Sequence, residues 1–231
     1  MLFSQLPLRF ALLAFVSLLP GCTSAPHYEA IRPVILSKVL PPPPEAGSPA
    51  DKKDLADVLA AQKQRTPGQA AEAKLDAQLD IFRFRPALGG KFTPDNLPVT
   101  VAFFRQVKLD EDVLIEAAKR HYNRPRPFVA SAAVHPVVPQ PPNASYPSGH
   151  AAFAYVNGTL LAKMLPEKKA AIMARAAHYA RNRVIGGVHY PTDITAGKEA
   201  AAVIVDALLE DAEFRADFGK ARAELRAVVL K

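Results

Sequence analysis

Residues 167–183 read EKKAAIMARAAHYARNR, a run in which helix-favouring residues recur at spacings of three and four. The same pattern of Ala, Leu, Lys and Glu covers 51–64, 69–84, 110–122 and 198–209, whereas the alternation typical of strands is nearly absent. With 231 residues, 49% of them hydrophobic, the chain can bury one substantial core. These patterns predict a single all-α domain, a helical bundle, over 51–231.

The N-terminus has the pattern of an export signal. Arg9 precedes the apolar run 10–19, which has the length of a signal-peptide core and is shorter than the roughly 20 residues of a membrane span. The run leads into Leu19-Pro20-Gly21-Cys22, which is similar to a bacterial lipobox apart from Pro20. We therefore predict a lipoprotein-type signal peptide over 1–21, lipidation of Cys22, and a periplasmic or cell-envelope location with an anchor in the outer membrane. An ordinary cleaved signal with an incidental cysteine is the alternative.

Two proline-rich stretches interrupt the helical patterns. Residues 22–50 contain Pro41–Pro44 and several small residues, a composition typical of an extended, flexible tether. Residues 123–147 carry seven prolines, which predicts a long irregular loop, and long loops in compact domains are usually functional. No second run of 18 apolar residues follows the signal, so we expect the mature domain to be soluble.

Three segments carry residues suited to anion chemistry, and the first contains two cations. Lys119 lies in the last turn of the helix predicted over 110–122, and Arg126 stands before Pro127. Both side chains could reach one anion. A solvated basic helix end, favoured by the helix dipole, explains the same residues. The formal net charge of +7 does not decide between an anionic substrate, a membrane surface and nucleic acid.

The second segment, Tyr146-Pro147-Ser148-Gly149-His150, comes directly before a helical run over 151–165. Ser148 is a natural N-cap, and the free amides at the start of such a helix bind phosphate. Gly149 would let a ligand approach the backbone closely, and His150 would place a titratable ring beside the anion. A capped helix with an incidental histidine is the alternative interpretation.

The third segment, residues 182–193, reads NRVIGGVHYPTD. Gly186 and Gly187 break one helix, and Pro191 is typical of the first residue of the next. His189 would then lie just outside a helix start. Asp193, four residues on, could accept a hydrogen bond from one imidazole nitrogen and leave the other free as a nucleophile. Alternatively, Asp193 merely serves the helix dipole.

Together the three segments resemble the signature of the type 2 phosphatidic acid phosphatase superfamily, which includes bacterial class A non-specific acid phosphatases, membrane lipid phosphatases and vanadium haloperoxidases. The soluble class A branch is the most similar. One position departs from the pattern, because Asn182 stands where the family usually has serine, and we expect an altered phosphate affinity. The resemblance rests on three motifs. In the first, six residues separate Lys119 from Arg126-Pro127, and the second is Pro147-Ser148-Gly149-His150. In the third, five residues separate Arg183 from His189, and three separate His189 from Asp193.

The resemblance implies a helical bundle of the acid phosphatase and vanadium haloperoxidase type, and a broad-specificity acid phosphatase acting on small-molecule phosphate monoesters. It implies that His189 attacks phosphorus, that Asp193 orients it, and that His150 protonates the leaving group, with no metal ion or other cofactor. A protonated His150 favours mildly acidic pH. A homodimer is a further implication. The residues implied to hold the phosphoryl group are Lys119, Arg126, Ser148, Gly149 and Arg183.

Three other functions compete with this one. A membrane-associated lipid or isoprenoid-pyrophosphate phosphatase would use the same motifs, normally between transmembrane helices, which the sequence lacks, although an anchor at Cys22 would bring the enzyme to lipid substrates. A vanadium haloperoxidase would use the same anion site in a longer chain. A catalytically dead anion-binding lipoprotein is opposed by the intact His150, His189 and Asp193. The sequence gives no metal-ligand spacing and no reason to expect a nucleic-acid partner.

Overall fold

The structure, a computed structural model, describes residues 25–231, and every regular element in this range is a helix. The all-α prediction is confirmed. Short 3₁₀ turns lie at Glu29–Ile31, Ile81–Phe84, Pro94–Asn96 and Pro166–Lys168. The α-helices are α1 (Leu36–Val39), α2 (Pro49–Gln64), α3 (Pro67–Leu75), α4 (Arg85–Leu88), α5 (Pro98–Tyr122), α6 (Pro127–Ala130), α7 (Gly149–Met164), α8 (Lys169–Ile185), α9 (Pro191–Glu210) and α10 (Ala212–Val229).

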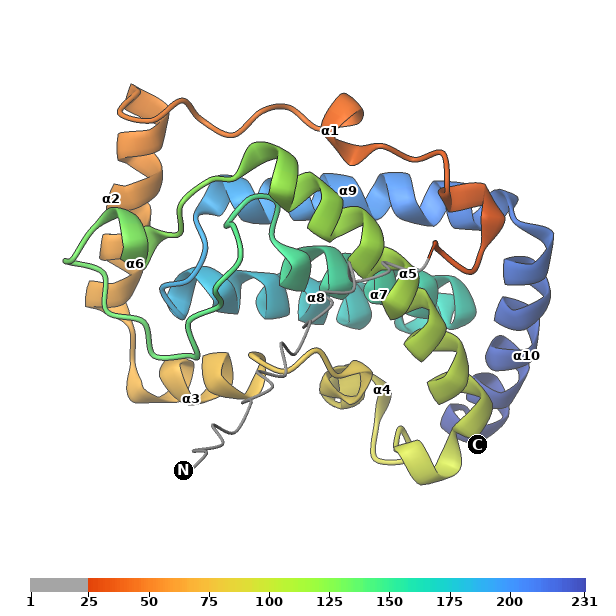
Figure 1. Ribbon diagram of the computed structural model, residues 1–231. Coiled ribbons are helices and arrows are strands. Elements are labelled where there is room, and N and C mark those ends of the chain that lie inside the picture. The colour runs from red at the N-terminus through yellow and green to blue at the C-terminus, as the bar shows by residue number, and fades with distance from the viewer. Residues whose placement is uncertain (1–24) are drawn as a thin grey trace, which may run out of the picture.

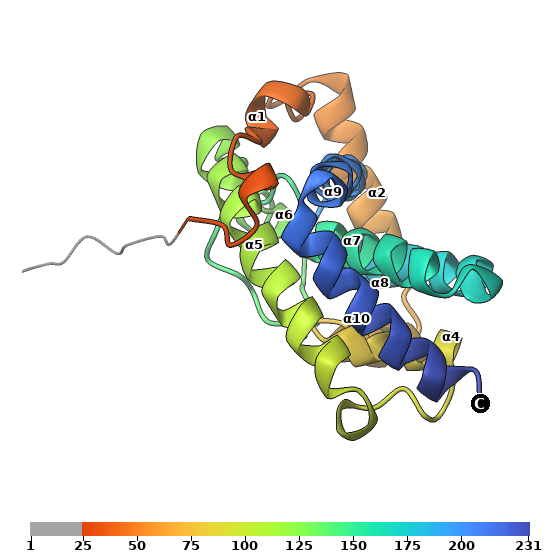
Figure 2. The same cartoon turned by 90° about the vertical axis from the view of Figure 1, so that its right-hand side faces the viewer.

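Helix α7 is the centre of the bundle, packed between α8 and α9, with α5 crossing it and α10 closing one end (Figure 1). It is apolar on all sides, as expected for a helix that is buried on every face. Small residues allow the close packing, since a Cβ added at Gly158 would lie 2.9 Å from the Cβ of Ala176 on α8. Figure 2 shows α5 and α10 side by side on one flank of this core.

The segment before α2 contradicts the predicted tether. Tyr28, Ile31, Leu36 and Leu40 are buried in the main hydrophobic core, and the segment runs along α9 to the top of α2 (Figure 1). The flexible tether predicted over 22–50 is therefore wrong for residues 25–50, because the apolar side chains between the prolines bury themselves on the domain. The predicted signal peptide and Cys22 lie outside the described residues.

Hydrogen bonds from side chains of the domain to backbone groups fix the same segment. The carboxylate of Asp110 on α5 accepts from the amides of His27 and Tyr28 at 2.8 and 3.0 Å. The hydroxyl of Tyr122 donates to the carbonyl of Leu40 at 2.9 Å, and that of Tyr146 donates to the carbonyl of Pro41 at 2.5 Å. The packed domain thus starts well before the predicted boundary at residue 51.

Other boundaries differ in detail. The helix predicted over 69–84 ends at Leu75, and the one predicted from 110 already begins at Pro98. Residues 123–148 contain only the single turn α6 and otherwise run irregularly across one end of the bundle, as the prolines indicate. No helix among residues 25–231 is both long and apolar enough to cross a membrane.

Candidate active site

The predicted site residues converge at one end of the bundle. The last turn of α5, the first turns of α7 and α9 and the last turn of α8 meet there, and residues 143–145 of the long loop cover them. Lys119, Arg126, Arg183, His189 and Asp193 are all buried, with exposed fractions of 0–4%. The structure brings together residues that lie up to 74 positions apart in the sequence.

His189 and Asp193 form a buried pair at the start of α9. Pro191 begins this helix, so His189 precedes it and Asp193 lies in its first turn. His189 Nδ1 is 3.1 Å from Asp193 Oδ2, which also accepts from the Tyr190 amide at 2.9 Å and from the Ser145 hydroxyl at 2.5 Å. An ionised Asp193 accepts the proton of Nδ1. Nε2, which then carries the ring's lone pair, lies 3.2 Å from Nη1 of Arg126.

The surroundings keep His189 uncharged. Burial holds the pKa of the His189 imidazole well below its ordinary value, and the nearby charges of Arg126, Lys119 and Arg183 lower it further. Burial raises the pKa of the Asp193 carboxyl, whereas Arg124 and the hydrogen bonds from Ser145 and the Tyr190 amide oppose that rise. A neutral imidazole beside a carboxylate is the state in which Nε2 can act as a nucleophile.

Backbone carbonyls hold two of the cations. Arg126 donates from Nε to the carbonyl of Asn143 at 2.7 Å and from Nη1 to the carbonyl of Val188 at 2.8 Å. Lys119 Nζ donates to the carbonyl of Ala144 at 2.6 Å. Burial, together with the charge of Arg126, lowers the pKa of Lys119 to about 7, and burial lowers the pKa of Arg126 to about 10.

Arg183 differs from these two, because its Nε and Nη1 are buried without a hydrogen-bond partner in the described part of the chain. Burial lowers the pKa of this guanidinium to about 10. Buried donors without partners are rare, and an anion would supply the missing acceptors. The neighbouring Asn182 donates from Nδ2 to Asp76 at 2.7 Å. Its effect on phosphate affinity stays a prediction.

The start of α7 supplies the remaining predicted residues. Ser148 is the N-cap, as predicted, and its hydroxyl accepts from the Ala151 amide at 3.2 Å. A Cβ added at Gly149 would already touch the Ile115 side chain at 3.4 Å. His150 Nε2 lies 3.0 Å from the carbonyl of Ala77, which can only accept, so this nitrogen carries a proton. Burial and the charge of Arg183 lower the pKa of His150 to about 3.

Sequence reasoning missed three residues at this site. Ser145 donates to Asp193, and Arg124 does so from the other side, with its Nη1 2.9 Å from Asp193 Oδ1. Arg124 is in turn bonded to Asp54 on α2 at 2.8 Å. The sequence Arg124-Pro125-Arg126-Pro127 offered two arginines, and only the second matched the motif. Nothing local indicates that Asp54 is a partner.

Comparisons with known proteins identify relatives of this chain. Residues 108–211 match the family model of the PAP2 superfamily. A non-specific acid phosphatase of Salmonella typhi is 28% identical over 216 residues, covering 89% of this chain and 86% of that protein. An acid phosphatase of Zymomonas mobilis is 30% identical over 196 residues (80% and 74%), and a non-specific acid phosphatase of Providencia stuartii is 30% identical over 195 residues (80% and 79%).

Two solved structures have the same fold. A transmembrane PAP2-type phosphatidylglycerolphosphate phosphatase from Bacillus subtilis superposes with a TM-score of 0.52 at 21% identity, over 74% of this chain and 87% of that one. A bacterial vanadium-dependent iodoperoxidase superposes with a TM-score of 0.61 at 16% identity, over 79% of this chain and 53% of that one. The helical bundle of this chain is thus a fold that both solved structures share. The chain belongs to the PAP2 superfamily, and it is a phosphatase.

Proposed function

We propose that this protein is an acid phosphatase that hydrolyses small-molecule phosphate monoesters without a metal ion, through a phosphohistidine at His189. The observation that carries the proposal is the arrangement around the His189 ring. Nδ1 is held by Asp193 at 3.1 Å, and Nε2 faces the Arg126 guanidinium at 3.2 Å, where a phosphoryl group would be bound. Similarity to acid phosphatases over most of the chain supports the substrate class.

In this proposal the phosphoryl oxygens are bound by charge and by amides. Lys119, Arg126 and Arg183 supply three buried positive groups, and the first turn of α7, capped by Ser148, supplies outward-facing amides at Gly149. Phosphoryl transfer demands mainly positioning and stabilisation of charge on the equatorial oxygens. Arginine forks suit this task because they bind two oxygens at once.

The reaction has two steps. In the first, the lone pair of His189 Nε2 forms a bond to phosphorus, the bond to the leaving oxygen breaks, and His150 gives that oxygen a proton. In the second, His150 takes a proton from water, the resulting oxygen attacks phosphorus, and the P–N bond breaks to release phosphate. Asp193 holds the Nδ1 proton throughout and stabilises the positive charge on the phosphorylated ring.

The proton on His150 arrives with the substrate. The pKa of His150 is lowered to about 3 by burial and by the charge of Arg183, so the ring is neutral in the empty site at ordinary pH. A phosphate monoester keeps one proton below its second pKa, about 6. The monoanion can pass this proton to His150, because the resulting dianion offsets the surrounding cations. Activity at mildly acidic pH follows.

We further propose that the protein is exported and anchored through a lipid on Cys22, which would place it in the cell envelope at the outer membrane. The apolar run 10–19 and the lipobox-like sequence at 19–22 support this. Mass spectrometry of the membrane-extracted mature N-terminus tests it. A diacylated Cys22 is expected, and an unmodified N-terminus at residue 26 or later would contradict the proposal.

The catalytic proposal is tested by trapping the intermediate. Acid-sensitive, alkali-stable label from a ³²P-aryl phosphate is expected on wild type and absent from His189→Ala, whose turnover should fall at least about 10³-fold. His178→Ala is the matched control, because His178 lies in the middle of α8, has a side chain that is 46% exposed and contacts Glu72. Label retained by His189→Ala, or turnover that chelator abolishes and a divalent ion restores, would overturn the proposal.

A further inference from the structure

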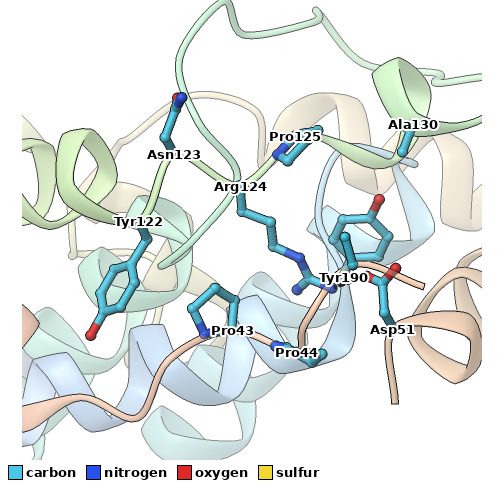
Figure 3. Close-up of a pocket in the computed structure, with 10 residues that line it drawn as sticks. Pro43, Pro44, Asp51, Tyr122, Asn123, Arg124, Pro125, Ala130 and Tyr190 are labelled. Atoms are coloured by element: carbon cyan, nitrogen blue, oxygen red, sulfur yellow. Dashed lines mark hydrogen bonds and ion pairs between the residues drawn. The ribbon is translucent and has the colours of Figure 1, made fainter. Parts of the chain in front are cut away.

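Behind the His189–Asp193 pair, a single guanidinium joins α9 to α2. Arg124 Nη1 donates to Asp193 Oδ1 at 2.9 Å and to the Thr192 hydroxyl at 2.8 Å. Its Nη2 donates to Asp54 Oδ2 at 2.8 Å and to Asp51 Oδ1 at 3.0 Å. Figure 3 shows the Arg124 side chain reaching down between Tyr190 and the prolines before α2. Four hydrogen bonds to three carboxylates and a hydroxyl fix its position.

We propose that Arg124, held by Asp54, is a positioning residue that fixes Asp193 and thereby the tautomer of His189. The inference rests on the proposed function, in which His189 Nε2 is the nucleophile. It extends the catalytic machinery to α2, which lies outside the residues 108–211 that match the superfamily.

The contacts of Asp54 support a dedicated role. Its side chain is 4% exposed, and besides Arg124 it accepts from the amide of Thr192 at 3.3 Å and from the Thr192 hydroxyl. Thr192 lies between the start of α9 and Asp193, so Asp54 holds both the guanidinium and the backbone beside the catalytic carboxylate. Asp51 is 28% exposed, accepts from the same Nη2 at the longer distance of 3.0 Å, and has no bond to Thr192. The two carboxylates therefore provide a strong and a weak support for the same arginine.

An aromatic face completes the clamp. The Arg124 guanidinium carbon lies 3.9 Å from the centroid of the Tyr190 ring, a cation–π contact, and the Tyr190 amide donates to Asp193 Oδ2. Arg124 thus contacts Oδ1 of Asp193 directly, and it also packs on Tyr190, whose amide binds Oδ2 of Asp193. Truncating the side chain would release both restraints.

The charge of Arg124 sets the protonation of Asp193. Burial raises the pKa of Asp193, and Arg124 is the largest opposing influence. The other charged or titratable side chains near this carboxyl are His189, Lys119, Arg126, Tyr146 and Tyr190. Without Arg124 the carboxyl keeps its proton at higher pH and donates a hydrogen bond to Nδ1, so the single ring proton lies on Nε2. That tautomer has no lone pair for phosphorus.

The structure provides a route for rescue. A cavity of about 250 Å³ opens beside Arg124 and is lined by Pro43, Pro44, Tyr122 and Tyr190 (Figure 3). Arg124→Ala would join the vacated space to this cavity. A free guanidinium ion can then enter and occupy the place of the side-chain head group between Asp54 and Asp193.

The experiment compares kcat, KM and the ¹⁵N NMR signals of His189 in Arg124→Ala, Asp54→Asn and Asp51→Asn. We expect kcat to fall about 10–100-fold in the first two, with KM changed less, and to stay within about twofold in Asp51→Asn. Guanidinium chloride at low concentration should restore Arg124→Ala, whereas equal sodium chloride should not. The NMR signal of wild type should show a protonated Nδ1, and that of Arg124→Ala a protonated Nε2.

Folded Arg124→Ala enzyme with wild-type kcat and an unchanged His189 signal would overturn the inference, and so would equal losses in Asp51→Asn and Asp54→Asn. If Arg124→Ala does not fold, the single variants Arg124→Lys and Asp54→Asn provide the same test. The NMR measurement needs no turnover. A wild-type protein without a phosphohistidine would therefore refute the proposed function, while the tautomer data still decide whether Arg124 positions His189.

Discussion

Gly197 on α9 allows the two helices that carry the proposed catalytic groups to touch. A Cβ added there would lie 2.5 Å from the carbonyl oxygen of Ser148, 2.8 Å from the Ala151 Cβ and 3.1 Å from the Ala152 amide nitrogen. The Ser148 amide also donates to the Asp193 carbonyl at 3.0 Å across the same contact. Gly197→Ala therefore acts at the junction between the first turn of α7, which we propose binds phosphate, and the His189–Asp193 segment.

The magnitude follows from the clash. To reach an ordinary contact of 3.4 Å, α7 and α9 must separate by about 0.9 Å at this point. A displacement of about 1 Å between reacting groups costs about 10²-fold in rate. Overpacking lowers the free energy of unfolding by about 1–3 kcal/mol, and the better helix propensity of alanine offsets about 1 kcal/mol of this loss. We expect kcat to fall about 10²-fold with only a modest loss of stability.

Gly158→Ala is the matched control. Its added Cβ would meet the Ala176 Cβ at 2.9 Å, further along α7 and seven positions before Arg183 on α8. Urea unfolding and steady-state kinetics on an aryl phosphate separate the two effects. Both variants should unfold at lower urea, but only Gly197→Ala should lose kcat. A Gly197→Ala enzyme that is destabilised yet keeps kcat within about twofold would refute the argument that this contact positions the site.

Two further outcomes are expected. The kcat/KM of an alkyl phosphate should fall above about pH 6, because the substrate monoanion brings the proton for His150. The midpoint of this fall should therefore move with the second pKa of the substrate. A midpoint that stays near pH 7 for every substrate, at the pKa to which burial lowers Lys119, would contradict this. Tyr28→Ala should lower the free energy of unfolding by about 3–5 kcal/mol in urea, because Tyr28 packs edge-on against Phe214 in the core. Val39→Ala, at a position that is 57% exposed, is the control for Tyr28→Ala. If both variants lowered the free energy of unfolding by the same small amount, the packing of this segment would be contradicted.

The motif residues were predictable because each motif is local. Ser148 precedes a helix, and His189 and Asp193 are separated by the three residues that turn a chain into α9, so cap and turn chemistry indicate their geometry. Arg124 was not predictable, since its partner Asp54 lies 70 positions away and no short spacing joins them. Long-range polar pairs of this kind depend on how α2 packs, which periodicity does not reveal.

The N-terminal segment was misread for a different reason. Proline-rich composition favours an extended chain, and residues 41–44 are indeed irregular. An extended chain can still pack, however, when apolar residues between the prolines meet a groove. Tyr28, Ile31, Leu36 and Leu40 do so, each at 6% exposure or less. Composition reports the local conformation of such a segment but not whether it is bound to the domain.

The charge balance of the site is consistent with the anion binding that we propose for it. Among residues 25–231, no ion pair reaches Lys119, Arg126 or Arg183, whereas Arg124 takes up one oxygen of Asp193. The charges of Asp193 and Glu116 act on Lys119 and Arg126, and that of Asp76 acts on Arg183, without a direct ion pair. Burying unpaired charge is costly, and the lowered pKa of each cation, caused first by burial, reflects that cost. A bound phosphoryl group would offset that cost by placing negative charge beside the three cations.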